Sequence, residues 1–325
     1  MKQTSYARYL FIFFVVYVIA SLAVVWVKRS DLLPWIGGCN PAGYDDDHYM
    51  AYCHTRRYGD YEHWSFWNSS EPGVIDRVKQ ANVLFVGNSS TQFGFSTQAV
   101  KDFFARNSDI SYYVLGFGMG SSSEVVRRLS ERFSIKPDVL IVNADPFFRA
   151  SWNGANRKMV NEAPLVAWEH KVKKWWQGQQ AEVCADDKNS FIGGFLCTEG
   201  LETVYRSRST GMWRTDYYRA DKRLPVGFSE ESIHLLDEAV YTAKAFFEST
   251  GISPECTIMT IAPRDKTEQK FAELLATRLG MTTAFANADG LTTVDGFHLS
   301  PDSAERWSAE VLEMAEKTIR ACVSN

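Results

Sequence analysis

Short apolar runs recur along most of this chain, and segments with helical spacing of their apolar residues lie between them. The runs are residues 82–86 (NVLFV), 112–115, 138–142 (DVLIV) and 257–262 (TIMTIA). A continuous apolar run of this length is typical of a strand that is buried on both faces of a parallel sheet. Parallel strands need crossover connections, and helices of the right length lie between these runs. The sequence therefore predicts a three-layer α/β/α sandwich with a parallel central sheet.

The helical segments agree with that architecture. They are residues 97–106, a segment with Val125, Leu129 and Phe133 on one face, and residues 230–249, 266–279 and 301–321; residues 283–286 suggest one more short strand. The last helix has a clear start, with Ser300 as N-cap, Pro301 at the first helical position and Asp302 in the positive first turn.

Two regions interrupt the alternation, which we assign to a domain of residues 76–325. Residues 151–225 are rich in Trp, Tyr, Arg and Lys, and we interpret them as an insertion or cap. Residues 30–75 show no helical or strand periodicity, so we expect an irregular segment there. Within it, Asp45, Asp46, Asp47 and His48 are adjacent in sequence. Contiguous carboxylates cannot all face one ion, which favours a solvated acidic loop over a metal site.

The N-terminus contains a run of 19 residues without a charge, residues 9–27. That length is close to the roughly 20 residues that cross a bilayer as a helix. A cleaved signal peptide is the alternative, because Ser21-Leu22-Ala23 fits a small-x-small cleavage site. The apolar run continues beyond that site to Val27, which favours a retained transmembrane anchor with residues 1–29 as cytoplasmic tip and membrane helix.

The cysteines indicate an oxidising compartment. The chain has six of them, an even number, and none forms a CxxC pair. Cys256 opens the fourth strand and Cys322 closes the last helix, which runs antiparallel to the strands, so both should lie at one end of the sheet and form a disulfide. Cys184–Cys197 and Cys39–Cys53 are the remaining local pairs. The alternative is six buried thiols in a cytosolic protein.

Charge excludes one class of partner. The net charge is −4, so the chain has no basic field with which to hold a polyanion, and we expect no nucleic-acid partner. No metal-ligand spacing and no cofactor fingerprint is present, and we expect neither a metal nor a cofactor.

Two short motifs carry candidate chemistry. Gly87-Asn88-Ser89 directly follows a buried strand, so it delivers a hydroxyl to the carboxyl edge of the sheet, where open α/β sheets bind ligands. Asp295-Gly296-Phe297-His298 precedes the last helix. A serine hydroxyl needs a base to become a nucleophile, and a histidine base needs a fixed acceptor on its second nitrogen. Asp295 can supply that acceptor to His298 from the same turn.

Together these motifs resemble the SGNH (GDSL-like) hydrolase superfamily, whose first block reads GDS or GNS and whose last reads DxxH. The resemblance implies Ser89 as nucleophile, His298 as general base and Asp295 as its orienting partner. It also implies an oxyanion hole that includes the Ser89 N–H. For the glycine of the second block, Gly118 and Gly120 are both candidates, and the start of the following helix favours Gly120.

The third block of that superfamily, GxND, is where this chain departs. Ala144 stands where the oxyanion asparagine belongs, and Asn143 could replace it only if the strand end is shifted by one residue. The loss of one such donor costs about 10²–10³-fold in rate. The departure therefore leaves room for a slow or specialised acyltransferase, or for a relative without activity.

An anchor, an exported SGNH-like domain and an aromatic insertion look similar to the cell-envelope branch of the superfamily. That resemblance implies O-acyl transfer, with acetyl the favoured group, onto an envelope or extracellular polysaccharide. It also implies a multi-spanning membrane O-acyltransferase as acyl-donor partner and a catalytic domain on the periplasmic side of the inner membrane. Trp175, Trp176 and Trp213 are candidate sugar platforms, although packing within the insertion explains each equally well. The alternatives are a carbohydrate acetyl esterase with the same triad and a non-catalytic polysaccharide-binding scaffold.

Overall fold

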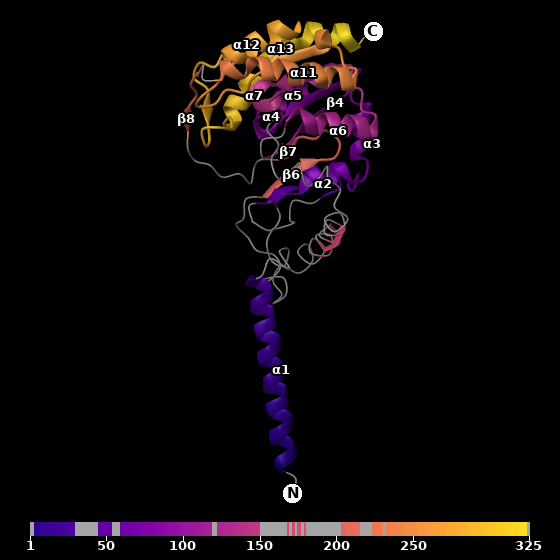
Figure 1. Cartoon of the computed structure of the whole chain (residues 1–325), viewed down its shortest axis with the longest axis vertical. Helices are drawn as coiled ribbons and strands as arrows, with labels where there is room; N and C mark the ends of the chain where they lie inside the picture. Colours follow the sequence, from indigo (N-terminus) through magenta and orange to yellow (C-terminus); the bar gives the residue numbers. More distant parts are fainter. Residues whose placement is uncertain are drawn as a thin grey trace. The chain divides into compact units, whose positions relative to one another are not determined.

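The computed structural model shows two compact units. It describes residues 3–29, 45–53, 59–118, 122–149, 168, 171–172, 174–176, 179, 203–214, 223–229 and 232–323. One unit comprises Met1–Ala42, Cys53–Gly59 and Lys173–Leu201, and the other comprises Gly43–Tyr52, Asp60–Val172 and Glu202–Asn325. The second unit contains the predicted sheet (Figure 1).

A parallel sheet of five strands forms the centre of this second unit, in the order β10-β9-β5-β3-β4. The strands are β3 (Val83–Gly87), β4 (Tyr112–Gly116), β5 (Val139–Asn143), β9 (Thr257–Thr260) and β10 (Thr282–Thr283). In the register, Gly87 pairs with Gly116 and Val86 pairs with Val142. Strands β3, β5 and β9 are buried along their whole length, as the continuous apolar runs predicted.

Helices cover both faces of the sheet because alternate side chains of each strand point to opposite sides. Leu84 and Val86 share a core with one group of helices, and Val83 and Phe85 share a core with another. The first group is α3 (Val74–Gln80), α6 (Ser123–Phe133), α11 (Leu236–Thr250) and α12 (Gln269–Leu279), and the second is α4 (Ser89–Phe95), α5 (Gln98–Arg106) and α13 (Pro301–Val323). The prediction of a parallel sheet flanked by helices is confirmed.

Residues 45–75 differ from the expected irregular segment. They contain β1 (His48–Cys53) and α2 (Tyr61–Trp67), and β6 (Thr203–Ser207) lies between β1 and β7 (Trp213–Arg214) in a second sheet. Tyr49, Met50 and Ala51 of β1 are all buried. The strand was missed because its partner lies about 150 residues away in sequence and no local turn announces the pairing.

Short elements complete the described chain. They are β2 (Gly59–Asp60), α7 (Ala144–Phe147), β8 (Leu224–Pro225), η1 (Ile233–Leu235), η2 (Pro254–Cys256) and β11 (Thr292–Thr293). Strand β8 pairs antiparallel with β11, which immediately precedes the Asp295–His298 motif.

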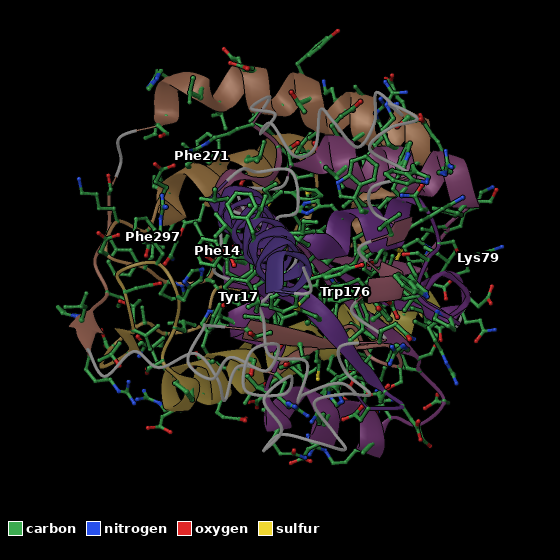
Figure 2. All side chains as sticks on the ribbon, turned by 90° about the horizontal axis from the view of Figure 1, so that it is seen from below. Phe14, Tyr17, Lys79, Trp176, Phe271 and Phe297 are labelled. Atoms are coloured by element: carbon green, nitrogen blue, oxygen red, sulfur yellow. A yellow bond between two sulfur atoms is a disulfide. The ribbon has the colours of Figure 1, made fainter. Side chains whose placement is uncertain are left out.

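The N-terminal apolar run lies within one helix, α1 (Gln3–Arg29). Figure 2 views this helix almost along its axis, with Phe14 and Tyr17 labelled on it. Both side chains are exposed, and so are Leu10, Phe11 and Ile19. Among the residues that the structure describes, no helix combines the length and the apolar character needed to cross a membrane.

The predicted pairing of Cys256 with Cys322 is confirmed. A disulfide joins them, with their Cα atoms 5.8 Å apart. Cys256 ends η2 just before β9, and Cys322 lies in the last turn of α13, so the bridge ties the N-terminal end of a strand to the C-terminal end of the last helix. The predicted pairs Cys39–Cys53 and Cys184–Cys197 involve side chains outside the described part of the chain.

Replacing both Cys256 and Cys322 with serine is expected to lower the free energy of unfolding by about 2–4 kcal/mol, because the bridge closes a loop of 66 residues. Chemical denaturation of both proteins, with and without reductant, measures the difference. The reductant should destabilise the parent chain more than the double variant, which retains only the four other cysteines. Equal stability of the two proteins without reductant would contradict a formed bridge.

Candidate active site

Ser89 lies just beyond the carboxyl end of β3, an inner strand of the sheet, where a tight turn leads directly into a helix. Gly87 ends the strand with φ 155°, and a Cβ added there would meet Thr91 Oγ1 at 2.0 Å. Asn88 caps helix α4 by accepting a hydrogen bond from the Ser90 N–H at 2.9 Å. Ser89 is therefore the first residue of α4, and its hydroxyl is held at the sheet edge that the sequence predicted.

Asp295 and His298 lie in a turn that hydrogen bonds make rigid. Asp295 Oδ1 accepts from the N–H groups of Phe297 at 2.9 Å and His298 at 2.8 Å. The His298 carbonyl oxygen accepts from the Val294 N–H at 2.8 Å and closes the turn. Gly296 sits inside it with φ 90°, a conformation that favours glycine. Helix α13 begins three residues after His298 and anchors the turn.

The two motifs meet as predicted. His298 Nε2 lies 2.8 Å from Ser89 Oγ, and His298 Nδ1 lies 2.7 Å from Asp295 Oδ2. An ionised carboxylate can only accept, so Nδ1 carries the proton and the lone pair of Nε2 faces the Ser89 hydroxyl. This is the arrangement in which a histidine can take a proton from serine.

The Asp295 carboxyl is kept ionised. Partial burial on its own would raise its pKa, but the hydrogen bond and charge of His298 and the two backbone N–H donors outweigh burial and hold the pKa well below the ordinary value. Asp295 therefore remains an acceptor for Nδ1 throughout the neutral pH range.

Helix α4 supports the imidazole as well as supplying the serine. The Ser90 hydroxyl donates to the Phe297 carbonyl oxygen at 3.3 Å, which links the two motifs a second time. The Phe93 ring packs against the His298 ring, with centroids 4.3 Å apart and planes 32° apart. Trp213 packs edge-on against Phe93 at 5.8 Å. The His298 imidazole thus contacts a carboxylate through Nδ1 and an aromatic ring through its face.

The candidate oxyanion donors differ in whether their N–H groups are already bonded to protein acceptors. The Gly118 N–H donates to Glu62 Oε1 at 2.9 Å, so it is committed to a protein acceptor, and Gly120 lies outside the described residues. Asn143 is fully buried at the end of β5, its Oδ1 accepting from the Ala262 N–H at 3.1 Å and its Nδ2 lying 3.4 Å from Asn88 Oδ1. Within the described chain, the Ser89 N–H makes no hydrogen bond.

Trp213 does not form an exposed platform at the triad. Trp213 is only 6% exposed, and its indole N–H donates to Glu62 Oε2 at 3.1 Å. Trp175 is exposed and its ring centroid lies 6.3 Å from that of Trp176, but both belong to the other compact unit. The exposed aromatic residue beside the triad is Phe297, which is 52% exposed and labelled in Figure 2.

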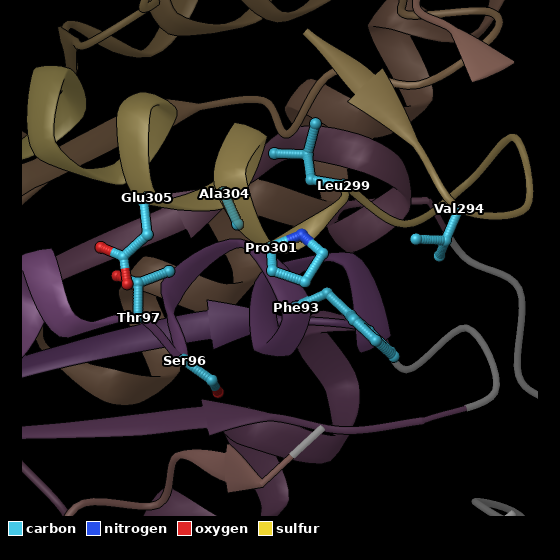
Figure 3. Close-up of a pocket in the computed structure, with 8 residues that line it drawn as sticks. All are labelled: Phe93, Ser96, Thr97, Val294, Leu299, Pro301, Ala304 and Glu305. Atoms are coloured by element: carbon cyan, nitrogen blue, oxygen red, sulfur yellow. The ribbon is translucent and has the colours of Figure 1, made fainter. Parts of the chain in front are cut away.

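A small pocket lies beside Phe93, the aromatic residue that packs against His298. Its volume is about 70 Å³, and Figure 3 shows Phe93, Val294 and Leu299 among the residues that line it. Val294 and Leu299 flank the Asp295–His298 segment in sequence. The volume is far below the roughly 300–1,000 Å³ of sites that enclose drug-sized ligands. This pocket can hold a few water molecules but is too small for a sugar ring.

Asp45 and His48 contact each other. Asp45 Oδ1 accepts from the Asp47 N–H at 2.9 Å and lies 2.9 Å from His48 Nδ1. Among the described residues, no group of three or more His, Cys, Asp or Glu side chains is placed to hold a metal ion.

Sequence reasoning missed three buried residues below the triad: Glu62, Gln92 and Arg206. Gln92 Nε2 donates to the carbonyl oxygens of Val114 at 3.1 Å and Gly116 at 2.8 Å, which holds α4 against the end of β4. Gln92 lies three residues after Ser89, so a polar residue one helical turn beyond the predicted nucleophile was the local signal for it. Glu62 and Arg206 carry no local signal, because they belong to segments far apart in the sequence.

No family model, no curated protein and no solved structure matches this chain. The chemistry of the site therefore rests on the geometry above.

Proposed function

We propose that this chain is a serine-dependent enzyme that transfers an acyl group through a covalent acyl-serine. The observation that carries the proposal is the unbroken line of contacts from Asp295 Oδ2 through His298 to Ser89 Oγ, at 2.7 and 2.8 Å. Three side chains from two distant segments, in the order and orientation that nucleophilic catalysis requires, are hard to explain by packing alone.

The chemistry follows from these contacts. Ser89 Oγ attacks the acyl carbon of a donor ester while His298 Nε2 takes the hydroxyl proton, and the donor alcohol then leaves with that proton. In the second half, an acceptor hydroxyl gives its proton to Nε2 and attacks the acyl-serine. The bond between the acyl carbon and Ser89 Oγ then breaks, and Nε2 returns the proton to Oγ. The Ser89 N–H is available for the developing oxyanion, and Gly120 is the further donor that we propose. Gly118 no longer belongs to that set, because Glu62 occupies its N–H.

The proposal also names the acceptor of the acyl group and the location of the protein. We propose O-acetyl transfer to a cell-envelope polysaccharide by an SGNH-like domain, with residues 9–27 holding the chain in the inner membrane and residues 151–225 forming its cap. A multi-spanning membrane O-acyltransferase would supply the acyl group on the periplasmic side. The Cys256–Cys322 disulfide supports an oxidising compartment, because such bonds persist there and are rare in the cytosol.

Phe297 supports a sugar acceptor. Its backbone is fixed on both sides, by Asp295 Oδ1 at the N–H and by the Ser90 hydroxyl at the carbonyl oxygen. Phe297 directly precedes the catalytic histidine in sequence, and its ring is 52% exposed. The Arg264 guanidinium lies over the ring, 6.0 Å from its centroid, so a sugar would use the other face. An aromatic face in this position can carry a sugar ring whose hydroxyl points toward an acyl-serine. We propose Phe297 in the role that the sequence suggested for Trp213.

One observation favours the esterase alternative. The His298 and Asp295 side chains are 18% and 28% exposed in the described structure, so water has access to the triad. Which reaction occurs depends on whether an acceptor competes successfully with that water.

A competition experiment with the full chain in detergent distinguishes the two reactions. With a small activated acetyl ester, added deacetylated envelope glycan should reduce acetate release and increase acetylated glycan, detected by mass spectrometry. Phe297→Ala should raise the half-saturating glycan concentration about 10-fold, if a sugar face gains as much as the lower part of the roughly 1–3 kcal/mol that a nucleic-acid base gains on an aromatic ring. Acetate release without glycan should stay unchanged. Rapid acetate release that glycan does not affect would establish the esterase instead.

A further inference from the structure

A fully buried ion pair lies beneath the proposed active site. Arg206 Nη1 of β6 donates to Glu62 Oε2 of α2 at 2.8 Å, and neither side chain has any exposed surface. Two charges removed from water are tolerated only where further hydrogen bonds compensate them. The remaining contacts of each partner therefore indicate what the pair holds in place.

Arg206 holds the open edge of the central sheet. Strand β4 is the edge strand, so the carbonyl groups on its outer side have no neighbouring strand. Arg206 donates to the Gly116 carbonyl oxygen at 2.9 Å and also to the Val114 carbonyl oxygen. Gln92 from α4 donates to the same two oxygens. The guanidinium also packs 4.6 Å from the Phe66 ring centroid and 5.3 Å from that of Phe117.

Glu62 continues this support on both sides of the site. Its Oε1 accepts from the Gly118 N–H, so the backbone is fixed from the Gly116 carbonyl to the Gly118 amide. This stretch leads into the glycine-rich turn in which we place the oxyanion donor Gly120. On its other side, Glu62 Oε2 accepts from the Trp213 indole N–H. Trp213 in turn packs on the Phe93 ring that contacts His298.

We infer that Glu62 and Arg206 are positioning residues for the reaction at Ser89. They fix the start of the glycine turn and, through Trp213 and Phe93, the ring of the general base, without touching the substrate. The inference rests on the proposed function, because it assigns the pair to the chemistry of Ser89. Burial raises the pKa of the Glu62 carboxyl, and the positive charge of Arg206 works against that rise.

A purely structural role for the pair is the competing explanation, and the chain offers a matched control. Glu71 is also buried, and its Oε2 accepts from Arg208 Nη2 at 2.9 Å, two residues after Arg206. Arg208 donates as well to the carbonyl oxygens of Asp45 and His48, so this second pair holds the entry to β1. Both pairs join the same two segments of the chain, and among the contacts of the described residues the Glu62–Arg206 pair is the one that reaches the Gly116–Gly118 stretch.

The test compares Glu62→Gln with Glu71→Gln in the full chain. The measured quantity is the second-order rate of Ser89 labelling by a fluorophosphonate, divided by the folded fraction from circular dichroism at the same temperature. Glu62→Gln should label about 10- to 100-fold more slowly than the parent, because small displacements of catalytic groups have effects of this size. It should lower kcat for an activated ester with little change in KM. Glu71→Gln should label within about 3-fold of the parent at a similar loss of thermal stability.

Trp213→Phe provides a second measurement in case Glu62→Gln does not fold. It removes the hydrogen bond to Glu62 and keeps an aromatic ring, so labelling per folded molecule should slow about 3- to 10-fold. The lost bond to a buried carboxylate is expected to lower stability by about 1–3 kcal/mol, so this rate is also divided by the folded fraction. Parent-like labelling in both Glu62→Gln and Trp213→Phe, or equal slowing in Glu71→Gln, would overturn the inference alone. A parent chain that the probe does not label at Ser89 would overturn the proposed function, and this inference with it.

Discussion

Replacing Ser89 with alanine is expected to abolish labelling by a serine-directed phosphonate and to remove acyl transfer and ester hydrolysis. The hydroxyl is the group that faces His298 Nε2, at 2.8 Å, and alanine leaves no nucleophile there. The melting temperature should change by less than about 4 °C, since one half-buried hydroxyl contributes about 1 kcal/mol. Intact-protein mass spectrometry and a thermal melt measure the two effects.

Ser90→Ala is the matched control for this experiment. Ser90 is the neighbouring serine, but its hydroxyl donates to the Phe297 carbonyl oxygen instead of facing the histidine. We expect Ser90→Ala to keep the label, at a rate reduced by less than about 10-fold, because it loosens the contact between α4 and the Asp295–His298 turn. Labelling that survives in Ser89→Ala and disappears in Ser90→Ala would show that Ser90, and not Ser89, is the nucleophile.

The sheet and the triad could be predicted because their signals are local. Residues 82–86 and 138–142 are continuous apolar runs that only a doubly covered strand explains, and both strands are found there. The Asp295–His298 contact spans three residues, so its geometry is determined within one turn. Ser89 could be placed opposite that turn because β3 ends, and α13 begins, at the carboxyl edge of the sheet.

The support of the site could not be predicted because it is non-local. Glu62 and Arg206 are 144 residues apart, and nothing in the sequence near either residue points to the other. The same holds for β1, whose neighbour β6 comes from the far end of the insertion. Trp213 illustrates the consequence, since aromatic composition suggested a sugar platform, whereas its indole N–H donates to a buried carboxylate.

Replacing Asp295 with asparagine should slow Ser89 labelling on the order of 10³- to 10⁴-fold while the fold is retained. The asparagine Oδ1 can still accept from the N–H groups of Phe297 and His298, so the turn persists. Its Nδ2, however, is a donor facing His298 Nδ1, which forces Nδ1 to become the acceptor and places the proton on Nε2. A protonated Nε2 cannot take the proton of Ser89. Labelling rates at several pH values and a thermal melt test both parts of this expectation.

Asp265→Asn is the control that separates this effect from a general loss of negative charge near the site. Asp265 lies beside the same turn, and its backbone N–H donates to the Gly296 carbonyl oxygen at 2.9 Å, a bond that the substitution leaves in place. Its carboxylate is close to Gly296, and an added Cβ there would lie 3.6 Å from Oδ2. We expect Asp265→Asn to label within about 3-fold of the parent, because surface substitutions of this kind have small effects. If the two variants labelled equally fast, the Asp295 carboxylate would not be orienting His298, and the pair would have to be explained as part of the turn alone.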